Sequence, residues 1–193
     1  LADFAEHAWP ALRARDLTAT LYVVAGAIGG RAEWLAGCDG ADGEPPAMLT
    51  ADQIRALHAE GCEIGAHSLT HPELDTLGRA AIDAEVSHSR RELSKILYQP
   101  VRSFAYPHGY HDRRVRDAVV RAGYDSAAAV REAFSSVADD QLALARVTIL
   151  HDVSVDGLGT ILDGVGHPAA PFPEPVRTKV LRLARRFGGR KPL

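Results

Sequence analysis

Residues 62–72 read Cys-Glu-Ile-Gly-Ala-His-Ser-Leu-Thr-His-Pro, an apolar run that leads into two histidines. The run from Cys62 to His67 predicts a short buried strand, and Pro72 prevents a simple helix from continuing through His71. The two histidines therefore lie at a strand-to-loop junction. At this spacing two neutral imidazoles can converge on one Zn²⁺, Co²⁺ or Ni²⁺ ion. Taken alone, however, the spacing favours two ordinary surface or core histidines over a metal site.

Strand and helix patterns alternate on both sides of this stretch. Strands are predicted at residues 18–25, 101–106, 124–130 and 142–150, and helices after the caps Asp3, Thr50 and Asp112, over 82–96 and over 155–165. This alternation predicts the α/β class, a parallel sheet with helices outside that is open or closed into a barrel. Chemistry in such folds lies at the C-terminal ends of the strands. Four histidines follow predicted strands there: His67, His71, His108 and His151.

The composition is that of one globular domain. The chain has 193 residues, of which 46% are hydrophobic and 24% charged, and its net charge of −3 gives no indication of nucleic-acid binding. No apolar run approaches the ~18–20 residues of a membrane span, and no signal peptide is visible. These features favour a cytoplasmic or membrane-peripheral location over secretion, but the compartment stays open. Cys38 and Cys62 form no Cys-x-x-Cys pair and are predicted to be ordinary thiols.

The predicted domain ends near residue 166. Residues 167–175 contain four prolines and predict a stiff linker, and residues 177–191 carry seven basic side chains and no acidic one. A basic amphipathic helix in residues 167–193 could contact an anionic membrane or a protein partner. The alternative is a solvated tail helix that packs a few apolar groups on the domain.

His67-Ser-Leu-Thr-His-Pro72 has the form His-Ser/Thr-x-x-His-Pro, and Ser103-Phe-Ala-Tyr-Pro-His-Gly109 follows it at a sensible distance. These segments, together with Asp3 to Pro10 and Leu17 to Val24, resemble successive motifs of one family. It is the polysaccharide deacetylase family, also described as the NodB homology or carbohydrate esterase 4 domain. The resemblance covers residues 1 to about 165.

The resemblance implies a distorted (β/α) barrel that hydrolyses an acetamide, or sometimes an acetyl ester, on a sugar. In the family, two histidines and an aspartate hold a divalent metal, which implies ligand roles for His67 and His71 and favours Zn²⁺, with Co²⁺ or Ni²⁺ possible. A backbone N–H of the third motif helps to form the oxyanion hole. By position, that donor would be the N–H of His108, with Tyr106 and Pro107 shaping the pocket wall.

The resemblance also implies groups that this chain lacks. The first motif, Asp-Asp-Gly, should lie directly upstream of Leu1 together with the first strand, and it supplies the base and the third metal ligand. Asp3 lies on the wrong side of that glycine and is expected to cap the first helix instead. We therefore expect a chain truncated relative to its parent, with weak metal binding and little activity. Ala105 stands where many members have an arginine that orients the base. This departure points to the subgroup of the family that has Phe-Ala-Tyr-Pro and lacks the arginine.

Further site residues follow from their positions after strands. Ile149-Leu-His-Asp152 resembles the fifth motif, in which a histidine protonates the leaving amine, so His151 is the candidate general acid. In related short domains, however, this strand begins with an arginine, as Arg146 does here, and carries no catalytic residue. Trp34, in a Gly-rich loop after a strand, is a candidate sugar-stacking platform. His108 and His111 could line the sugar site or be exposed loop histidines.

Two functions remain as hypotheses. The first is a metal-dependent hydrolase that removes acetyl groups from the N-acetylated, or O-acetylated, sugars of a glycan. The alternative is a non-catalytic carbohydrate-binding or interaction module of the same fold. An unrelated hydrolase with a chance histidine pair would leave the other matched segments unexplained. The sequence does not name the glycan: chitin oligomers, peptidoglycan, an exopolysaccharide and a glycolipid intermediate all fit.

Overall fold

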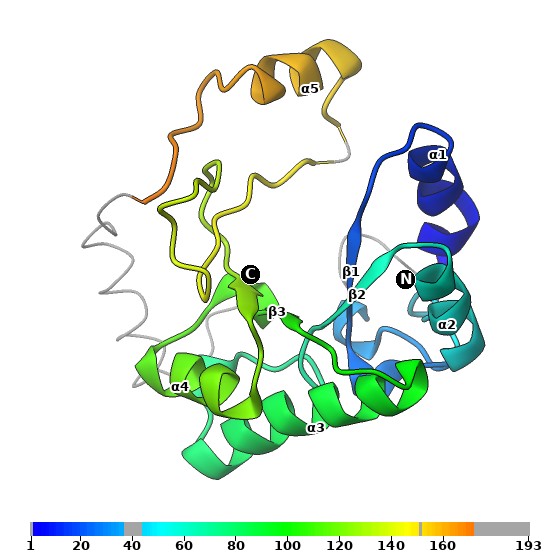
Figure 1. The fold of residues 1–193 in the computed structure, drawn as a ribbon, viewed down its shortest axis with the longest axis vertical. Coiled ribbons are helices and arrows are strands. Elements are labelled where there is room, and N and C mark those ends of the chain that lie inside the picture. Colours follow the sequence, from blue (N-terminus) through cyan, green and yellow to red (C-terminus); the bar gives the residue numbers. More distant parts are fainter. Residues whose placement is uncertain (1, 37–43, 151, 172–193) are drawn as a thin grey trace.

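A parallel four-stranded sheet organises the chain (Figure 1). The computed structural model describes residues 2–36, 44–150 and 152–171. The strands follow their chain order across the sheet: β1 Thr20–Val23, β2 Glu63–Ala66, β3 Ser103–Ala105 and β4 Ser126–Ala128. The predicted α/β fold with a parallel sheet is confirmed. Within the described residues these four strands form an open sheet in which β1 and β4 are the outer strands.

Helices connect the strands and cover the sheet. A π-helical turn, Phe4–Ala8, leads into α1, and the later helices separate the strands. The helices are α1 Trp9–Arg13, α2 Ala51–Ala59, α3 Arg79–Leu97, α4 Arg113–Ala122 and α5 Val155–Leu162. Figure 1 shows α3 running along one side of the sheet, with α5 on the far side of the molecule. In the part of the chain that the structure describes, no helix is long and apolar enough to cross a membrane.

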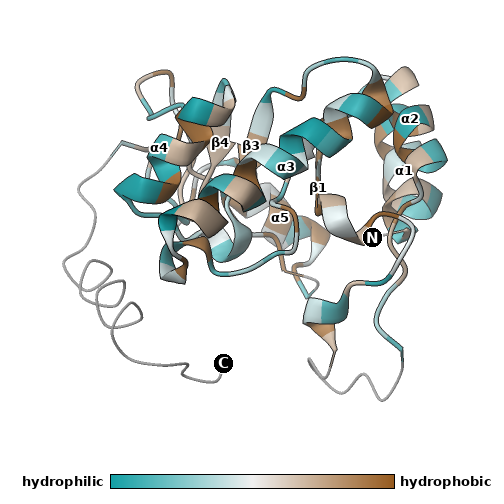
Figure 2. Ribbon diagram, turned by 90° about the horizontal axis from the view of Figure 1, so that it is seen from below, coloured by the Kyte–Doolittle hydropathy of each residue, from teal (hydrophilic) through white to brown (hydrophobic). Residues whose placement is uncertain are grey.

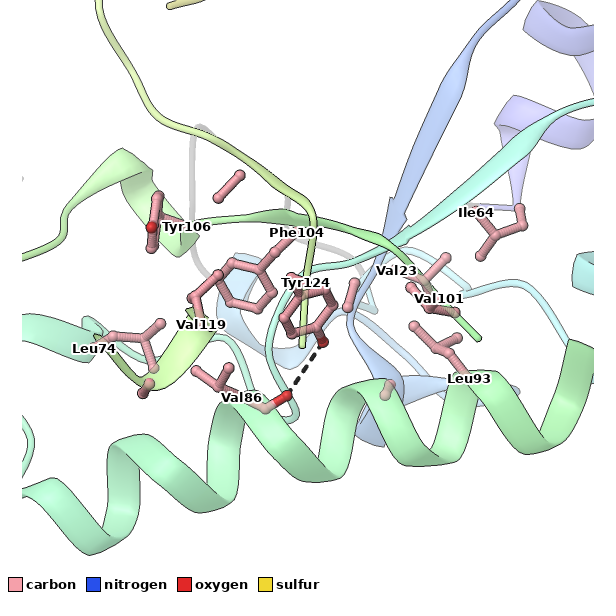
Figure 3. Close-up of a cluster of buried hydrophobic side chains, with 14 of the residues drawn as sticks. Val23, Ile64, Leu74, Val86, Leu93, Val101, Phe104, Tyr106, Val119 and Tyr124 are labelled. Atoms are coloured by element: carbon pink, nitrogen blue, oxygen red, sulfur yellow. Dashed lines mark hydrogen bonds between the residues drawn. The ribbon is translucent and has the colours of Figure 1, made fainter. Parts of the chain in front are cut away.

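The core lies between α3 and the sheet (Figure 3). Helix α3 buries Ile82, Val86, Ser89 and Leu93, which form the predicted stripe. The ring of Phe104 in β3 lies 5.1 Å from that of Tyr124, centroid to centroid, and the Tyr124 hydroxyl donates to the carbonyl of Val86. Burying one such large side chain contributes about 1.5–3 kcal/mol. Figure 2 shows hydrophilic and hydrophobic residues alternating along α3 and α4, as expected of helices with one buried face.

Two of the three predicted helix N-caps form. Thr50 and Gln53 make a reciprocal capping box at the start of α2, and the Asp112 carboxylate accepts from Val115 N at 3.0 Å. Gly123 ends α4 with a φ of +84°, as predicted. The prediction for Asp3 is wrong, because its side chain caps no N–H and the chain continues through a π-helical turn into α1, with Pro10 in the first turn.

The predicted strand at residues 142–150 does not form as a continuous strand. It pairs with its neighbours only at two isolated bridges, Ala128 with Leu144 and Arg131 with Arg146. Carboxylates replace a strand partner: those of Asp139, Asp140 and Glu132 accept from the backbone N–H groups of residues 145, 142 and 148. Because side chains satisfy these donors, no regular ladder is needed.

The register aligns the ends of the strands. Val23 pairs with Ala66, Ala66 with Phe104, and Phe104 with Ala127. The residues that follow β1, β2 and β3 therefore emerge at one edge of the sheet. This edge carries the two histidines of the loop after β2.

Candidate metal and carbohydrate site

The loop after β2, residues 67–71, holds a strained shape. Ser68 and His71 have φ values of +62° and +65°, which non-glycine residues adopt at a cost on the order of 1–3 kcal/mol. The buried Ser68 hydroxyl oxygen accepts from His71 N at 2.9 Å and so closes the loop on itself. The N–H of His67 donates to Val23 O at 2.8 Å, which extends the β1–β2 ladder into the loop. The backbone thus fixes the positions of both imidazoles.

His67 is prepared to donate a lone pair. Its Nδ1 lies 2.7 Å from the carbonyl oxygen of Ala105, so Nδ1 carries the hydrogen and Nε2 is left as the acceptor nitrogen. Burial, with a smaller contribution from the charge of Arg146, lowers the pKa of His67 to about 4. A neutral imidazole whose second nitrogen donates to a carbonyl is the usual arrangement of a metal-binding histidine.

His71 lies at the centre of an aromatic cluster. Its ring centroid is 4.8 Å from those of His67, His108 and Trp34. The indole of Trp34 stacks on it at an interplanar angle of 22°, whereas the other two rings meet it edge-on. Burial lowers the pKa of His71 to about 4, so this imidazole is also neutral near pH 7. Its Nδ1 is buried without a hydrogen-bond partner.

These features fit two ligands of a metal site. An unpartnered buried nitrogen is costly, and binding a cation would satisfy it. Both imidazoles are neutral, as Zn²⁺, Co²⁺ and Ni²⁺ require. Among residues 2–36, 44–150 and 152–171, however, no group of three or more His, Cys, Asp or Glu side chains is arranged to hold an ion. The described residues therefore offer two potential ligands, His67 and His71, where a catalytic zinc site uses three protein ligands.

The third-motif segment forms the floor beside the pair. Tyr106 and Pro107 are buried, and the Tyr106 hydroxyl donates to Leu142 O at 2.8 Å. His108 is exposed with a φ of +55°, and its ring meets that of His71. His111 is buried and stacks on Tyr106 with centroids 4.3 Å apart, so it is not the exposed loop histidine of one of our alternatives.

An open cavity of about 330 Å³ adjoins the histidine loop. Its walls come from the segment after β1 and from Leu69 and Thr70 of the loop. Trp34, on the short 3₁₀ turn Glu33–Leu35, lines this cavity and also stacks on His71. The sequence placed Trp34 near a sugar site, but nothing in the pattern indicated that it would contact a histidine 37 positions away. A separate cavity of about 510 Å³, lined by the C-terminal half of α3, by residues 99–100 and by Ala122 of α4, contains no imidazole.

Sequence reasoning missed two charged residues of the site. The guanidinium of Arg146 donates from Nε to Ala129 O at 3.0 Å and lies 5.8 Å from the ring centroid of Tyr22. Burial lowers its pKa. Glu85 of α3 accepts from the backbone of the histidine loop. An arginine within the apolar run 142–147 was a usable signal, whereas Glu85 had none. His151 and the basic residues 177–191 lie outside the described residues.

Comparison with known proteins identifies the class. The polysaccharide deacetylase family model matches residues 2–127, and the chain belongs to this family. It is 21% identical over 163 residues to "Putative polysaccharide deacetylase YxkH" of Bacillus subtilis (strain 168), covering 84% of this chain and 53% of that protein. The chain therefore spans about half the length of this curated relative.

Solved structures agree with this assignment. The Streptococcus pyogenes deacetylase PplD, in complex with acetate, is 27% identical with a TM-score of 0.68, over 82% of this chain and 64% of that one. A mutant of a carbohydrate esterase 4 family pseudoenzyme with restored enzymatic activity shares the fold, with 13% identity and a TM-score of 0.52. The match covers 86% of this chain and 60% of that one. The predicted family and its fold type are confirmed.

Proposed function

We propose that this chain carries the histidine pair of a metal-dependent glycan deacetylase. The observation that supports this most strongly is the buried, unpartnered Nδ1 of His71 beside the oriented, neutral imidazole of His67. His67 and His71 would hold the metal, most suitably Zn²⁺, with Co²⁺ or Ni²⁺ as alternatives. When bound, such an ion lowers the pKa of a water molecule and polarises an acyl carbonyl. The third ligand would be a carboxylate from outside the described residues.

The substrate would be an acetylated sugar of a glycan, whose acetamide, or acetyl ester, is hydrolysed. The cavity that Trp34 lines opens beside His71, and an indole is a suitable surface for a sugar ring. Tyr106 and Pro107 would support the pocket wall from behind, because both are buried. The backbone N–H of His108 would stabilise the developing oxyanion. His151 would protonate the leaving group as general acid.

Metal analysis of purified protein tests the central proposal. Wild type, His67→Ala and His71→Ala would be loaded with Zn²⁺, dialysed and assayed for bound metal, both as the 193 residues and with the upstream coding sequence restored. His7→Ala, whose side chain is exposed on the N-terminal π-helical turn, is the matched control. In the extended chain we expect both site variants to lose metal and the control to keep it, whereas the 193 residues alone should retain little metal. Unchanged metal content in both site variants would defeat the proposal.

Acetate release from chitin oligomers tests the reaction. We expect little activity from the 193 residues alone, because the base and the third ligand are implied to lie upstream. Robust deacetylation by these residues would overturn that expectation. Restored activity on a chain extended through an Asp-Asp-Gly sequence would support the enzyme function.

The second candidate is a non-catalytic carbohydrate-binding module. It is favoured by the lack of a three-ligand group among the described residues, and a pseudoenzyme shares the fold. Reading the codons upstream of Leu1 discriminates between the two, since an Asp-Asp-Gly there supports the enzyme and unrelated sequence supports the module.

The basic segment 177–191 would contact anionic membranes or a protein. Equal cosedimentation with anionic and neutral vesicles would count against the membrane contact.

A further inference from the structure

Glu85 connects helix α3 to the histidine loop. Its Oε2 accepts from the backbone N–H groups of Leu69 and Thr70, both at 2.9 Å. Its Oε1 accepts from the Thr70 hydroxyl at 2.7 Å. One carboxylate thus receives three hydrogen bonds from the two consecutive residues that lie between Ser68 and His71. Hydrogen bonds to a charged acceptor are stronger than those between neutral groups.

The loop needs such external support. Two of its five residues, Ser68 and His71, have positive φ values. On the side of β1, the N–H of Gly26 donates to Leu69 O at 2.8 Å, and that of Ala25 donates to Ser68 O at 3.1 Å. Glu85 supplies the opposing contact from α3, so the peptide groups around Leu69 are held from two elements. A strained conformation persists only where its surroundings fix it in this way.

We propose that Glu85 is a positioning residue that fixes the spacing of His67 and His71 for metal binding. This inference rests on the proposed function. Glu85 joins no group of potential ligands that could hold an ion, and in the described part of the chain it forms no ion pair with a cation. Its carboxylate acts through Leu69 and Thr70, on the backbone that carries both imidazoles.

The test compares three variants, each made with the upstream coding sequence restored. Glu85→Ala removes all three hydrogen bonds. Glu85→Gln keeps them, because its amide oxygen can accept from both backbone N–H groups while its NH₂ donates to Thr70 Oγ1. Glu92→Ala is the matched control, since Glu92 lies on the same helix and pairs with the surface cations Lys95 and Arg91. Hydrogen exchange of the Leu69 and Thr70 amides and Co²⁺ affinity, from the visible absorption of the bound ion, are measured for each.

We expect Glu85→Ala to speed exchange of both amides and to weaken Co²⁺ binding about tenfold or more, as loss of an outer-shell contact does. Glu85→Gln should stay within about threefold of wild type, and Glu92→Ala should match wild type. Thr70→Val, which removes one of the three bonds, should cause a smaller loss and serves if Glu85→Ala does not fold. If wild type binds Co²⁺ and Glu85→Ala and Thr70→Val bind it equally well, the inference is wrong while the proposed function stands. If wild type and His67→Ala bind equally, the proposed function itself fails.

Discussion

Gly26 lies against the histidine loop with no room for a side chain. A Cβ built on Gly26 would lie 2.6 Å from the carbonyl oxygen of Leu69, whereas ordinary contacts begin near 3.4 Å. In Gly26→Ala the loop must therefore retreat by about 0.8 Å, the difference between these two distances. The neighbouring atom belongs to the backbone, so no rotamer change can relieve the clash. The φ of Gly26 is not in the left-handed region, so the effect comes from this contact alone.

Two losses should follow from this displacement. Overpacking of this kind costs about 1–3 kcal/mol of unfolding free energy, and a loss of about 2 kcal/mol lowers Tm by about 4–8 °C in a chain of this size. A metal site tolerates displacements of only about 0.5 Å, so affinity for Co²⁺ should fall about 10- to 100-fold. Differential scanning calorimetry measures the first loss, and titration monitored by visible absorption measures the second.

Gly30→Ala is the matched control for Gly26→Ala. Gly30 lies in the same segment, and its added Cβ would meet no atom closer than 3.4 Å. We expect this variant to keep the Tm and the Co²⁺ affinity of wild type within error. If Gly26→Ala and Gly30→Ala behave alike in both measurements, close contact with Leu69 does not position the loop.

Three further variants test the core, a cap and the floor of the site. Phe104→Ala empties the centre of the sheet–α3 core and should cost about 3–5 kcal/mol in urea unfolding; a loss below 1 kcal/mol would show that the ring is not packed as described. Thr50→Ala breaks the capping box of α2 and should cost about 0.5–2 kcal/mol, with Thr50→Ser close to wild type. Tyr106→Phe removes the hydroxyl that donates to Leu142 O and should cost about 1 kcal/mol without changing Co²⁺ affinity; a large loss of metal would place Tyr106 in direct contact with the site.

The sequence predicted the parts of the fold that depend on neighbouring residues. The strands at 18–25, 62–67, 101–106 and 124–130 form, each shorter than predicted, because short runs rich in apolar residues next to glycine or proline carry their own signal. Thr50 and Asp112 begin their helices and Gly123 ends one, as predicted, because a cap is a contact within three or four residues. The continuous strand predicted at 142–150 does not form, because the carboxylates of Asp139, Asp140 and Glu132 take three of its N–H groups.

The candidate site was only partly predictable, because its residues are recognisable locally but the contacts that orient them are not. His67 and His71 were recognisable from their spacing and from the strand before them. The contacts that orient them were not, because they join distant segments: Ala105 is 38 positions from His67, and Glu85 is 16 positions from Leu69. No local pattern in α3 distinguishes Glu85 from the other acidic residues on that helix. Only the folded structure brings its carboxylate to the loop.

The geometry of the histidine pair does not depend on which of the two candidate functions is right. The loop is held by β1 through Gly26, by β3 through Ala105 and by α3 through Glu85, all within the described residues. A third ligand would therefore raise metal affinity without having to orient the two imidazoles. An unpaired buried nitrogen and two positive-φ residues are costs that a purely structural loop has no reason to retain. The strain in the loop thus supports the proposal that His67 and His71 bind a metal.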